Sequence, residues 1–178
     1  MSYPVRRPFQ RLSTARGRRW REGLALFTLL VISIALQGAL SSAFLSGGFR
    51  PDLVLIVVVS WGLKKGWKGG LVAGLSGGFL GDAFSAGMLG SGAISLAVAG
   101  SLVVLLSRPL YRKHFSTKIV LVAGSCLISS LVYYLLLILF RTPPPGPWVW
   151  KEVIWPHFWQ TVLIAPAWLW VAGKVMGE

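Results

Sequence analysis

Six long apolar runs, separated by charged or turn-forming residues, constrain the fold of this chain more than any other feature. The runs cover Gly23–Leu45, Pro51–Leu63, Trp67–Asp82, Met88–Ser107, Lys118–Phe140 and Pro156–Val175. Four of them, the first and the last three, approach the ~20 residues that a helix needs to cross a bilayer core of ~30 Å. The second and third are shorter and need tilt, local thinning of the bilayer or shielding by neighbours. The sequence therefore predicts an all-α integral membrane protein built as a six-helix transmembrane bundle.

Composition agrees with a membrane protein and disagrees with a soluble one. The 178-residue chain is 54% hydrophobic and only 13% charged, whereas soluble domains carry about 25% charged residues. The net charge of +13 would indicate nucleic-acid binding in a soluble protein. Here the placement of the basic residues offers a different explanation.

Lysine and arginine fall almost entirely on one side of the predicted spans. Seven arginines precede the first span, and eight more basic residues lie at the junctions between spans two and three and between four and five, or at the end of the sixth: Lys64, Lys65, Lys68, Arg108, Arg112, Lys113, Lys118 and Lys174. Only Arg50, Arg141 and Lys151 fall on the other side. The positive-inside rule then makes the first side cytoplasmic. We expect a multi-pass protein with both termini in the cytoplasm, anionic lipid headgroups near its basic residues, and no nucleic-acid partner.

This topology divides the chain into two parts. Residues 1–21 are expected to form a basic cytoplasmic arm that is mobile, because their charges favour solvation. Residues 22–176 are expected to form a single six-span membrane domain.

The third span is unusually rich in glycine and reads GWKGGLVAGLSGGFLGD over residues 66–82. On a helix, Gly70, Gly74, Gly77 and Gly81 fall on one narrow face. Each glycine in a water-exposed helix costs roughly 1 kcal/mol relative to alanine. In a bilayer a face without side chains allows two helices to pack backbone to backbone. We therefore expect another helix to grip the third span along this face.

Asp82 lies at the end of this helix, toward the outer boundary of the membrane core. One interpretation is that it accepts hydrogen bonds from backbone N–H groups at the start of the fourth span. The other is that it contacts a ligand or a partner, since acids within membrane segments are often functional. The sequence leaves both interpretations open.

The triplet Arg50-Pro51-Asp52 begins the second span. Proline suits the first turn of a helix, an acid there complements the helix dipole, and Arg50 reaches the outer headgroups. A helix start explains all three residues, and a binding role is the alternative.

Polar and proline residues inside or between the spans give three further predictions. Ser33, Gln37 and Ser41 recur every four residues, so we expect that stripe to face protein rather than lipid. Pro166 is expected to bend the sixth span. The loop 142–150, TPPPGPWVW, is either a rigid spacer or a docking site for an outer partner.

No sequence motif for catalysis is found. A Walker loop, a dinucleotide fingerprint, an HExxH pair and a paired-cysteine motif are all absent from the sequence. Cys126 is the one cysteine, and His114 and His157 are expected on opposite sides of the membrane. A nucleophile, a base and a charge-stabilising group cannot be assembled from these residues. We expect no enzymatic activity, no cofactor and no metal site.

Two segments carry a resemblance to a known family. Residues 49–56, FRPDLVLI, resemble the outer start of the second span in the bacterial rod-shape-determining MreD family. Residues 74–90, GLSGGFLGDAFSAGMLG, are similar to that family's glycine-rich helix, Gly-x-x-x-Asp, small loop and Leu-Gly. The candidate partner-binding or structural residues are Arg50, Pro51, Asp52, Gly70, Gly74, Gly77, Gly78, Gly81, Asp82 and Gly90.

The resemblance implies a non-enzymatic scaffold subunit of the cell-wall elongation complex in the bacterial plasma membrane. Such a subunit would bind MreC directly. Through the complex it would be linked to RodA with its penicillin-binding transpeptidase, which are the peptidoglycan synthases, and to MreB filaments.

The family is also similar in overall fold to the substrate-binding subunits of energy-coupling-factor transporters. That similarity supplies the alternative, a subunit that binds a vitamin-type small molecule for a transporter. Such a protein needs an outer cavity lined by several polar groups. The acids, Gln37 and the outer arginines are too few to make such a cavity an expectation.

Overall fold

The computed structural model describes residues 8–43, 51–84, 89–107, 115–140 and 154–176, together with Gly146 and Lys151. These ranges contain six helices: α1 (Pro8–Ala43), α2 (Leu53–Lys65), α3 (Trp67–Phe84), α4 (Ser91–Ser107), α5 (Phe115–Phe140) and α6 (Trp155–Met176). The all-α, six-helix architecture predicted from the apolar runs is therefore confirmed. Arg50 and the loop 142–150, apart from Gly146, lie outside the described residues.

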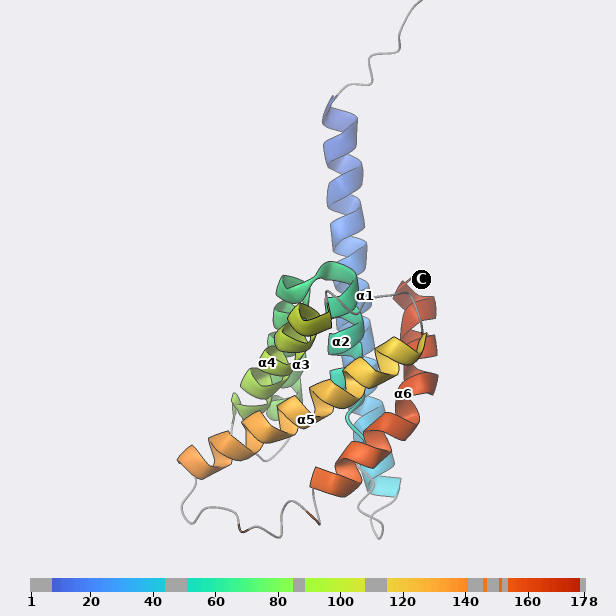
Figure 1. Ribbon diagram of the computed structural model, residues 1–178. Helices are drawn as coiled ribbons and strands as arrows, with labels where there is room; N and C mark the ends of the chain where they lie inside the picture. Colours follow the sequence, from blue (N-terminus) through green and yellow to red (C-terminus); the bar gives the residue numbers. More distant parts are fainter. Residues whose placement is uncertain are drawn as a thin grey trace, which may run out of the picture.

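The first helix begins earlier than the apolar pattern suggested, at Pro8 rather than Gly23. Its N-terminal part projects beyond the rest of the bundle (Figure 1). The part from Trp20 to Ser42 is one of two long apolar helical segments with the length to cross a membrane, and Thr117–Phe140 is the other. The mobility of the basic arm stays a prediction.

Helix α2 forms the centre of the bundle and contacts each of the other five helices. Its 13 residues span only about 20 Å at 1.5 Å per residue. Every residue from Leu53 to Gly62 is buried. Valine, isoleucine and leucine side chains pack on all sides of this helix, so its neighbours shield it, which is one of the three alternatives that the sequence left open.

The outer helices are arranged around α2 in three groups. Helices α3 and α4 form a close antiparallel pair on one side, and α1 and α6 lie on the other (Figure 1). Helix α5 crosses the bundle obliquely. Helix α6 contains Pro166 and changes direction part-way along its length (Figure 1), as its sequence predicted.

The two ends of the bundle differ in charge. The turn between α2 and α3 carries Lys64, Lys65 and Lys68, and it lies at the same end as the C-terminus of α6 with Lys174 (Figure 1). We call this the basic end. There the Lys65 ammonium forms an ion pair with Glu22 of α1. The opposite end is where α1 finishes and α4 starts.

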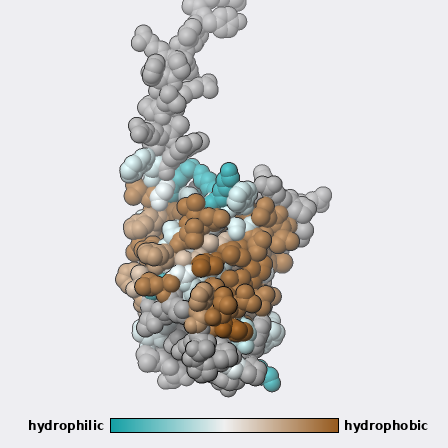
Figure 2. All heavy atoms as spheres, turned by 90° about the vertical axis from the view of Figure 1, so that its left-hand side faces the viewer, coloured by the Kyte–Doolittle hydropathy of each residue, from teal (hydrophilic) through white to brown (hydrophobic). Residues whose placement is uncertain are grey.

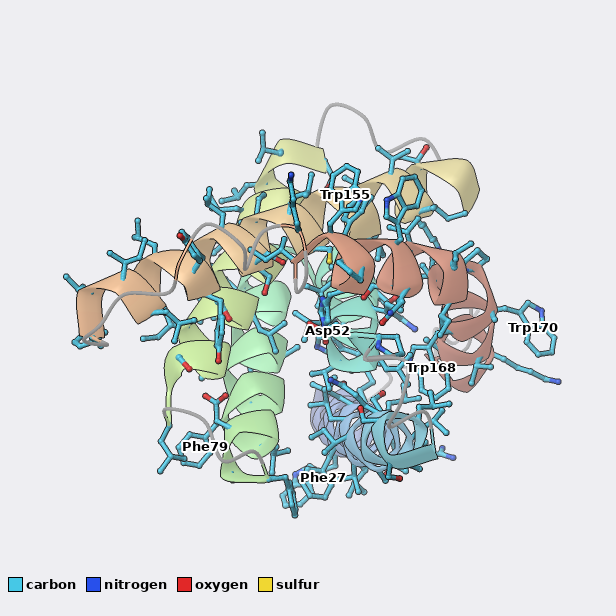
Figure 3. The ribbon with its side chains drawn as sticks, turned by 90° about the horizontal axis from the view of Figure 1, so that it is seen from below. Phe27, Asp52, Phe79, Trp155, Trp168 and Trp170 are labelled. Atoms are coloured by element: carbon cyan, nitrogen blue, oxygen red, sulfur yellow. The ribbon has the colours of Figure 1, made fainter. Side chains whose placement is uncertain are left out.

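Apolar side chains cover the outside of the bundle between its ends. Figure 2 shows a broad hydrophobic band bounded by hydrophilic residues at the basic end. Seen along the bundle, Phe27 of α1, Phe79 of α3 and Trp170 of α6 point away from it, while Asp52 lies in its interior (Figure 3). An apolar circumference around a buried core is what contact with lipid requires.

Candidate functional site

The α3–α4 pair is held by direct backbone contact. A β-carbon on Gly70 would lie 2.5 Å from the carbonyl oxygen of Gly100, and one on Gly74 would lie 2.6 Å from Cα of Ala97. A β-carbon on Gly78 would overlap the backbone of Ala93 in the same way. The three glycines are one turn apart, so they present a continuous groove to α4. Helix α4 is therefore the helix that packs against this face.

The remaining two glycines of the predicted face have different surroundings. A β-carbon on Gly77 would lie 2.9 Å from side-chain carbons of both Leu30 and Val54, so Gly77 faces α1 and α2. A β-carbon on Gly81 would meet nothing within 4 Å. The glycines predicted to share one partner thus divide between α4, the α1–α2 side and open space.

Asp82 joins the end of α3 to the start of α4. Its carboxylate accepts hydrogen bonds from the backbone N–H groups of Gly90 (2.8 Å), Gly92 (3.0 Å) and Ala93 (3.2 Å). The side chain is only 8% exposed. Gly90 has a positive φ of 96°, which a residue with a β-carbon rarely adopts. This is the geometry of the capping interpretation, in which the acid also complements the helix dipole.

Asp52 caps α2 and ties it to α6. Its Oδ1 accepts a hydrogen bond of 3.0 Å from the N–H of Leu55, and Pro51 beside it is fully buried. The backbone N–H of Asp52 donates to Thr161 Oγ1 at 3.0 Å, and the Thr161 hydroxyl donates to the carbonyl of His157 at 2.8 Å. A helix does start here, but at Leu53, so Asp52 is its N-cap and Pro51 precedes the cap, whereas the sequence placed both in the first turn.

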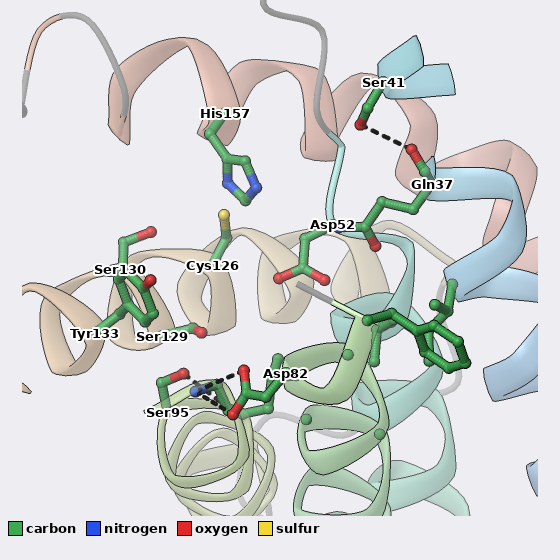
Figure 4. A pocket seen from close by; sticks show the side chains of 18 of the residues that line it. Gln37, Ser41, Asp52, Asp82, Ser95, Cys126, Ser129, Ser130, Tyr133 and His157 are labelled. Carbon is green, nitrogen blue, oxygen red and sulfur yellow. Dashed lines mark hydrogen bonds between the residues drawn. The ribbon is translucent and has the colours of Figure 1, made fainter. Parts of the chain in front are cut away.

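A partly open cavity of about 590 Å³ lies at the end of the bundle opposite the basic end. It is bounded by the last turns of α1 and α3, the first turns of α2, α4 and α6, and the second half of α5. Its polar lining residues are Gln37, Ser41, Asp52, Asp82, Ser95, Cys126, Ser129, Ser130, Tyr133, Tyr134 and His157. Figure 4 shows side chains from several helices at this cavity, among them Gln37, Asp52, Tyr133 and His157.

The cavity forms where the small-residue contacts stop. Gly38 of α1 and Gly81 of α3 both line it, and a β-carbon on either would meet nothing within 4 Å. About one turn of α3 closer to the basic end, Leu30 of α1 contacts α3 at Gly77. From that contact toward the opposite end, α1 and α3 separate. The polar stripe of α1 faces the interior there: Ser33 is buried, and Gln37 and Ser41 line the cavity. The prediction that this stripe faces protein is confirmed.

Sequence reasoning missed this cavity. It identified Asp52, Asp82, Gln37 and Ser41 but assigned no site to the side chains contributed by α5 and α6, among them Ser129, Tyr133 and His157. The signal was present as serines and tyrosines in an otherwise apolar run, at 125, 129, 130, 133 and 134. Their successive spacings of four, one, three and one residues place them within about half of the circumference of α5.

Titratable groups do not assemble into a metal site. Among the residues that the structure describes, no group of three or more histidine, cysteine or acidic side chains is arranged to hold a metal ion. The two carboxylates of the cavity are each engaged with a helix N-terminus.

A comparison with protein-family models identifies the family of this chain. The model of the rod shape-determining protein MreD family matches residues 18–175. The chain belongs to the MreD family. It is therefore a non-enzymatic membrane protein with a role in the determination of rod shape, in the context of the cell-elongation machinery.

The family match extends over all six helices and begins just before the apolar part of α1. A search of curated proteins and a search of solved structures each returned no match. The expected likeness of the fold to energy-coupling-factor subunits is accordingly unsupported. The MreD motif of residues 74–90 corresponds to the end of α3, the Asp82 cap and the Gly90 turn.

Proposed function

We propose that this MreD-family chain is the scaffold subunit of the bacterial cell-wall elongation complex that binds MreC directly. Through MreC it would be linked to RodA and its penicillin-binding transpeptidase, and to MreB filaments on the cytoplasmic side. The family membership supports a role in rod shape. The observation that carries the direct-binding part of the proposal is the partly open cavity at the end of the bundle opposite the basic end.

We further propose that the basic end is cytoplasmic and that the cavity faces the outer surface of the plasma membrane. The grouping of Lys64, Lys65, Lys68 and Lys174 at one end supports this orientation through the positive-inside rule. Both chain termini would then be cytoplasmic. The apolar circumference of the bundle would contact lipid tails, and the lysines would attract anionic headgroups.

The small-residue face of α3 is not the docking surface in this proposal. Gly70, Gly74 and Gly78 are occupied by α4, and Gly77 by Leu30 and Val54. A partner helix would have to displace α4 to use that face. A concave surface with polar groups from several helices is the kind of site that gives specific recognition. The outer cavity meets that description, so a membrane-proximal segment of MreC is proposed to dock in it.

Filling the cavity tests the proposal. Gly81→Leu introduces a side chain at a position where a β-carbon meets nothing within 4 Å and where the cavity wall is formed. The purified variant in lipid nanodiscs should bind MreC of the same genome at least about tenfold more weakly, a loss of roughly 1.4 kcal/mol. Cells that depend on the variant should lose rod shape.

Gly124→Leu on α5 is the matched control. A β-carbon at Gly124 also meets nothing within 4 Å, and Gly124 does not line the cavity. This control should retain MreC binding. If the folded Gly81→Leu variant binds MreC as tightly as the native chain does, the cavity is not part of the interface. Failure of the native chain to bind MreC would overturn the scaffold proposal.

A second candidate function is favoured by the chemistry of the same cavity. Its polar lining and its volume of about 590 Å³ lie within the range of small-molecule sites. This supports the alternative of a vitamin-type binding subunit of a transporter. Native mass spectrometry of the chain purified alone would show a stoichiometric bound small molecule in that case. The scaffold proposal expects no bound small molecule, and it expects the Gly81→Leu variant to weaken MreC binding.

A further inference from the structure

Gln37 brings an unpaired acceptor to the cavity. Its side-chain oxygen Oε1 is buried and has no hydrogen-bond partner among the described residues. A buried amide oxygen without a donor costs about 1–3 kcal/mol, so each such group in a native structure needs an explanation. Because Gln37 lines the cavity, a turn of its side chain would bring this buried oxygen to a donor supplied by an occupant of the cavity.

Asp52 brings a second acceptor to the same place. Its Oδ1 caps α2 through Leu55, while Oδ2 accepts no hydrogen bond from the described part of the chain. Figure 4 shows Gln37, Asp52 and His157 extending into one cavity from α1, the start of α2 and α6. Two residues with a free acceptor oxygen thus lie in the wall of one cavity.

The charge of the cavity is opposite to that of the chain as a whole. The sequence has 18 basic and five acidic residues, yet two of those acids, Asp52 and Asp82, line the cavity and none of the described lysines or arginines does. The Asp82 carboxylate is engaged by the N-terminus of α4. Asp52 is therefore the carboxylate with an oxygen left for an occupant, and His157 lines the same cavity.

We propose that the cavity binds a basic side chain, lysine or arginine, from the outer membrane-proximal segment of the partner. The Asp52 carboxylate and Gln37 Oε1 are its acceptors, because ammonium and guanidinium groups offer only donors. The rings of Tyr133 and Tyr134 in the cavity wall add faces that attract a cation. This inference rests on the proposed function, since it specifies what the docked segment of the partner presents.

Two substitutions test the recognition without filling the cavity. Asp52→Asn removes the charge and keeps a good N-cap residue, and Gln37→Leu removes the acceptor at similar size. With the full chain in nanodiscs, each should weaken binding of MreC about tenfold, as expected for a lost hydrogen bond to a charged group. Glu22→Gln at the basic end is the matched neutralisation, and its affinity should equal that of the native chain.

A double-mutant cycle identifies the partner's side chain. Each lysine and arginine of the outer membrane-proximal segment of MreC is replaced by glutamine and measured against native and Asp52→Asn chains. One of these replacements should weaken binding about tenfold to the native chain and have little further effect in the Asp52→Asn background. Purely additive effects at every position would overturn the inference.

The outcomes separate this inference from the proposed function. If Gly81→Leu weakens binding while Asp52→Asn and Gln37→Leu do not, the partner occupies the cavity without a basic side chain, and only the inference fails. If none of the three changes binding, the proposed docking site fails as well. Spermidine is the probe for a free amine: stoichiometric binding to the native chain, lost in Asp52→Asn while MreC binding is unchanged, assigns the acceptors to a small molecule and overturns the inference.

Discussion

Gly74 of α3 and Ala97 of α4 bring the two backbones into direct contact, so closely that a β-carbon on Gly74 would lie 2.6 Å from both N and Cα of Ala97. The same relationship recurs one turn away on either side, at Gly70 with Gly100 and at Gly78 with Ala93. Backbone contact over three turns maximises van der Waals packing where no hydrophobic effect drives helices together. This interface fixes where α3 ends and α4 starts, and so positions the cavity.

Gly74→Ala should destabilise the bundle by about 1–3 kcal/mol. The added methyl group meets backbone atoms of α4, which can move only if the helices separate, and overpacking of this kind is costly. Gly81→Ala in the same helix is the control, since its methyl group meets nothing within 4 Å, and stability should change by less than about 1 kcal/mol. Reversible unfolding in detergent measures both. Equal stabilities of the two variants would contradict the contact.

Asp82→Asn should lower the stability of the folded protein by about 2 kcal/mol. The neutral amide offers one acceptor oxygen where the carboxylate now receives N–H groups from Gly90, Gly92 and Ala93, and hydrogen bonds to a charged group contribute about 1.5–3 kcal/mol each. The measurement is the thermal unfolding midpoint together with MreC binding of the folded fraction. Normal stability with lost binding would instead support a partner contact at Asp82.

Thr161→Val should destabilise the junction between α2 and α6. The valine has a similar shape and fits the fully buried position of Thr161, but it leaves the partly buried backbone N–H of Asp52 without its acceptor, at a cost of about 1–3 kcal/mol. Thr161→Ser keeps the hydroxyl and should lose less. Hydrogen exchange of the first turn of α2 reports the effect locally. A serine variant as unstable as the valine variant would point to packing of the methyl group rather than to the hydrogen bond.

Local patterns in the chain were sufficient to predict the helices. Apolar runs interrupted by lysine, proline and glycine predicted six helices, and the bounds of α2 and α3 agree with the structure within two residues. The start of α1 was missed because the arginine-rich segment before Trp20 has no apolar pattern to mark a helix. Continuation of an existing helix costs less than its nucleation, so a helix extends into sequence that would not be recognised alone.

The candidate residues were predicted in type but not in arrangement. Glycine spacing on α3 indicated a face for close packing, yet Gly77 and Gly81 turned out to face different surroundings from Gly74. The angular position of a residue on its helix does not say which neighbouring helix lies there. It also does not say at which turn the neighbouring helices move apart. The sequence predicted that Asp82 is either a cap or a contact. The N–H groups that donate hydrogen bonds to it belong to Gly90 and to the first turn of α4, eight to eleven positions away.

The sequence by itself determined that this chain is a helical membrane protein with one basic end, and it carried the motifs of the MreD family. Those properties depend on composition and on periodicity within single helices, which are local. Only the tertiary structure decided that α4 occupies the glycine face of α3 and that Gln37, Asp52 and His157 share a cavity. These three residues come from three helices more than a hundred positions apart at the extremes. Which side chains converge depends on how the helices cross, and crossing angles are set by packing that no single helix encodes.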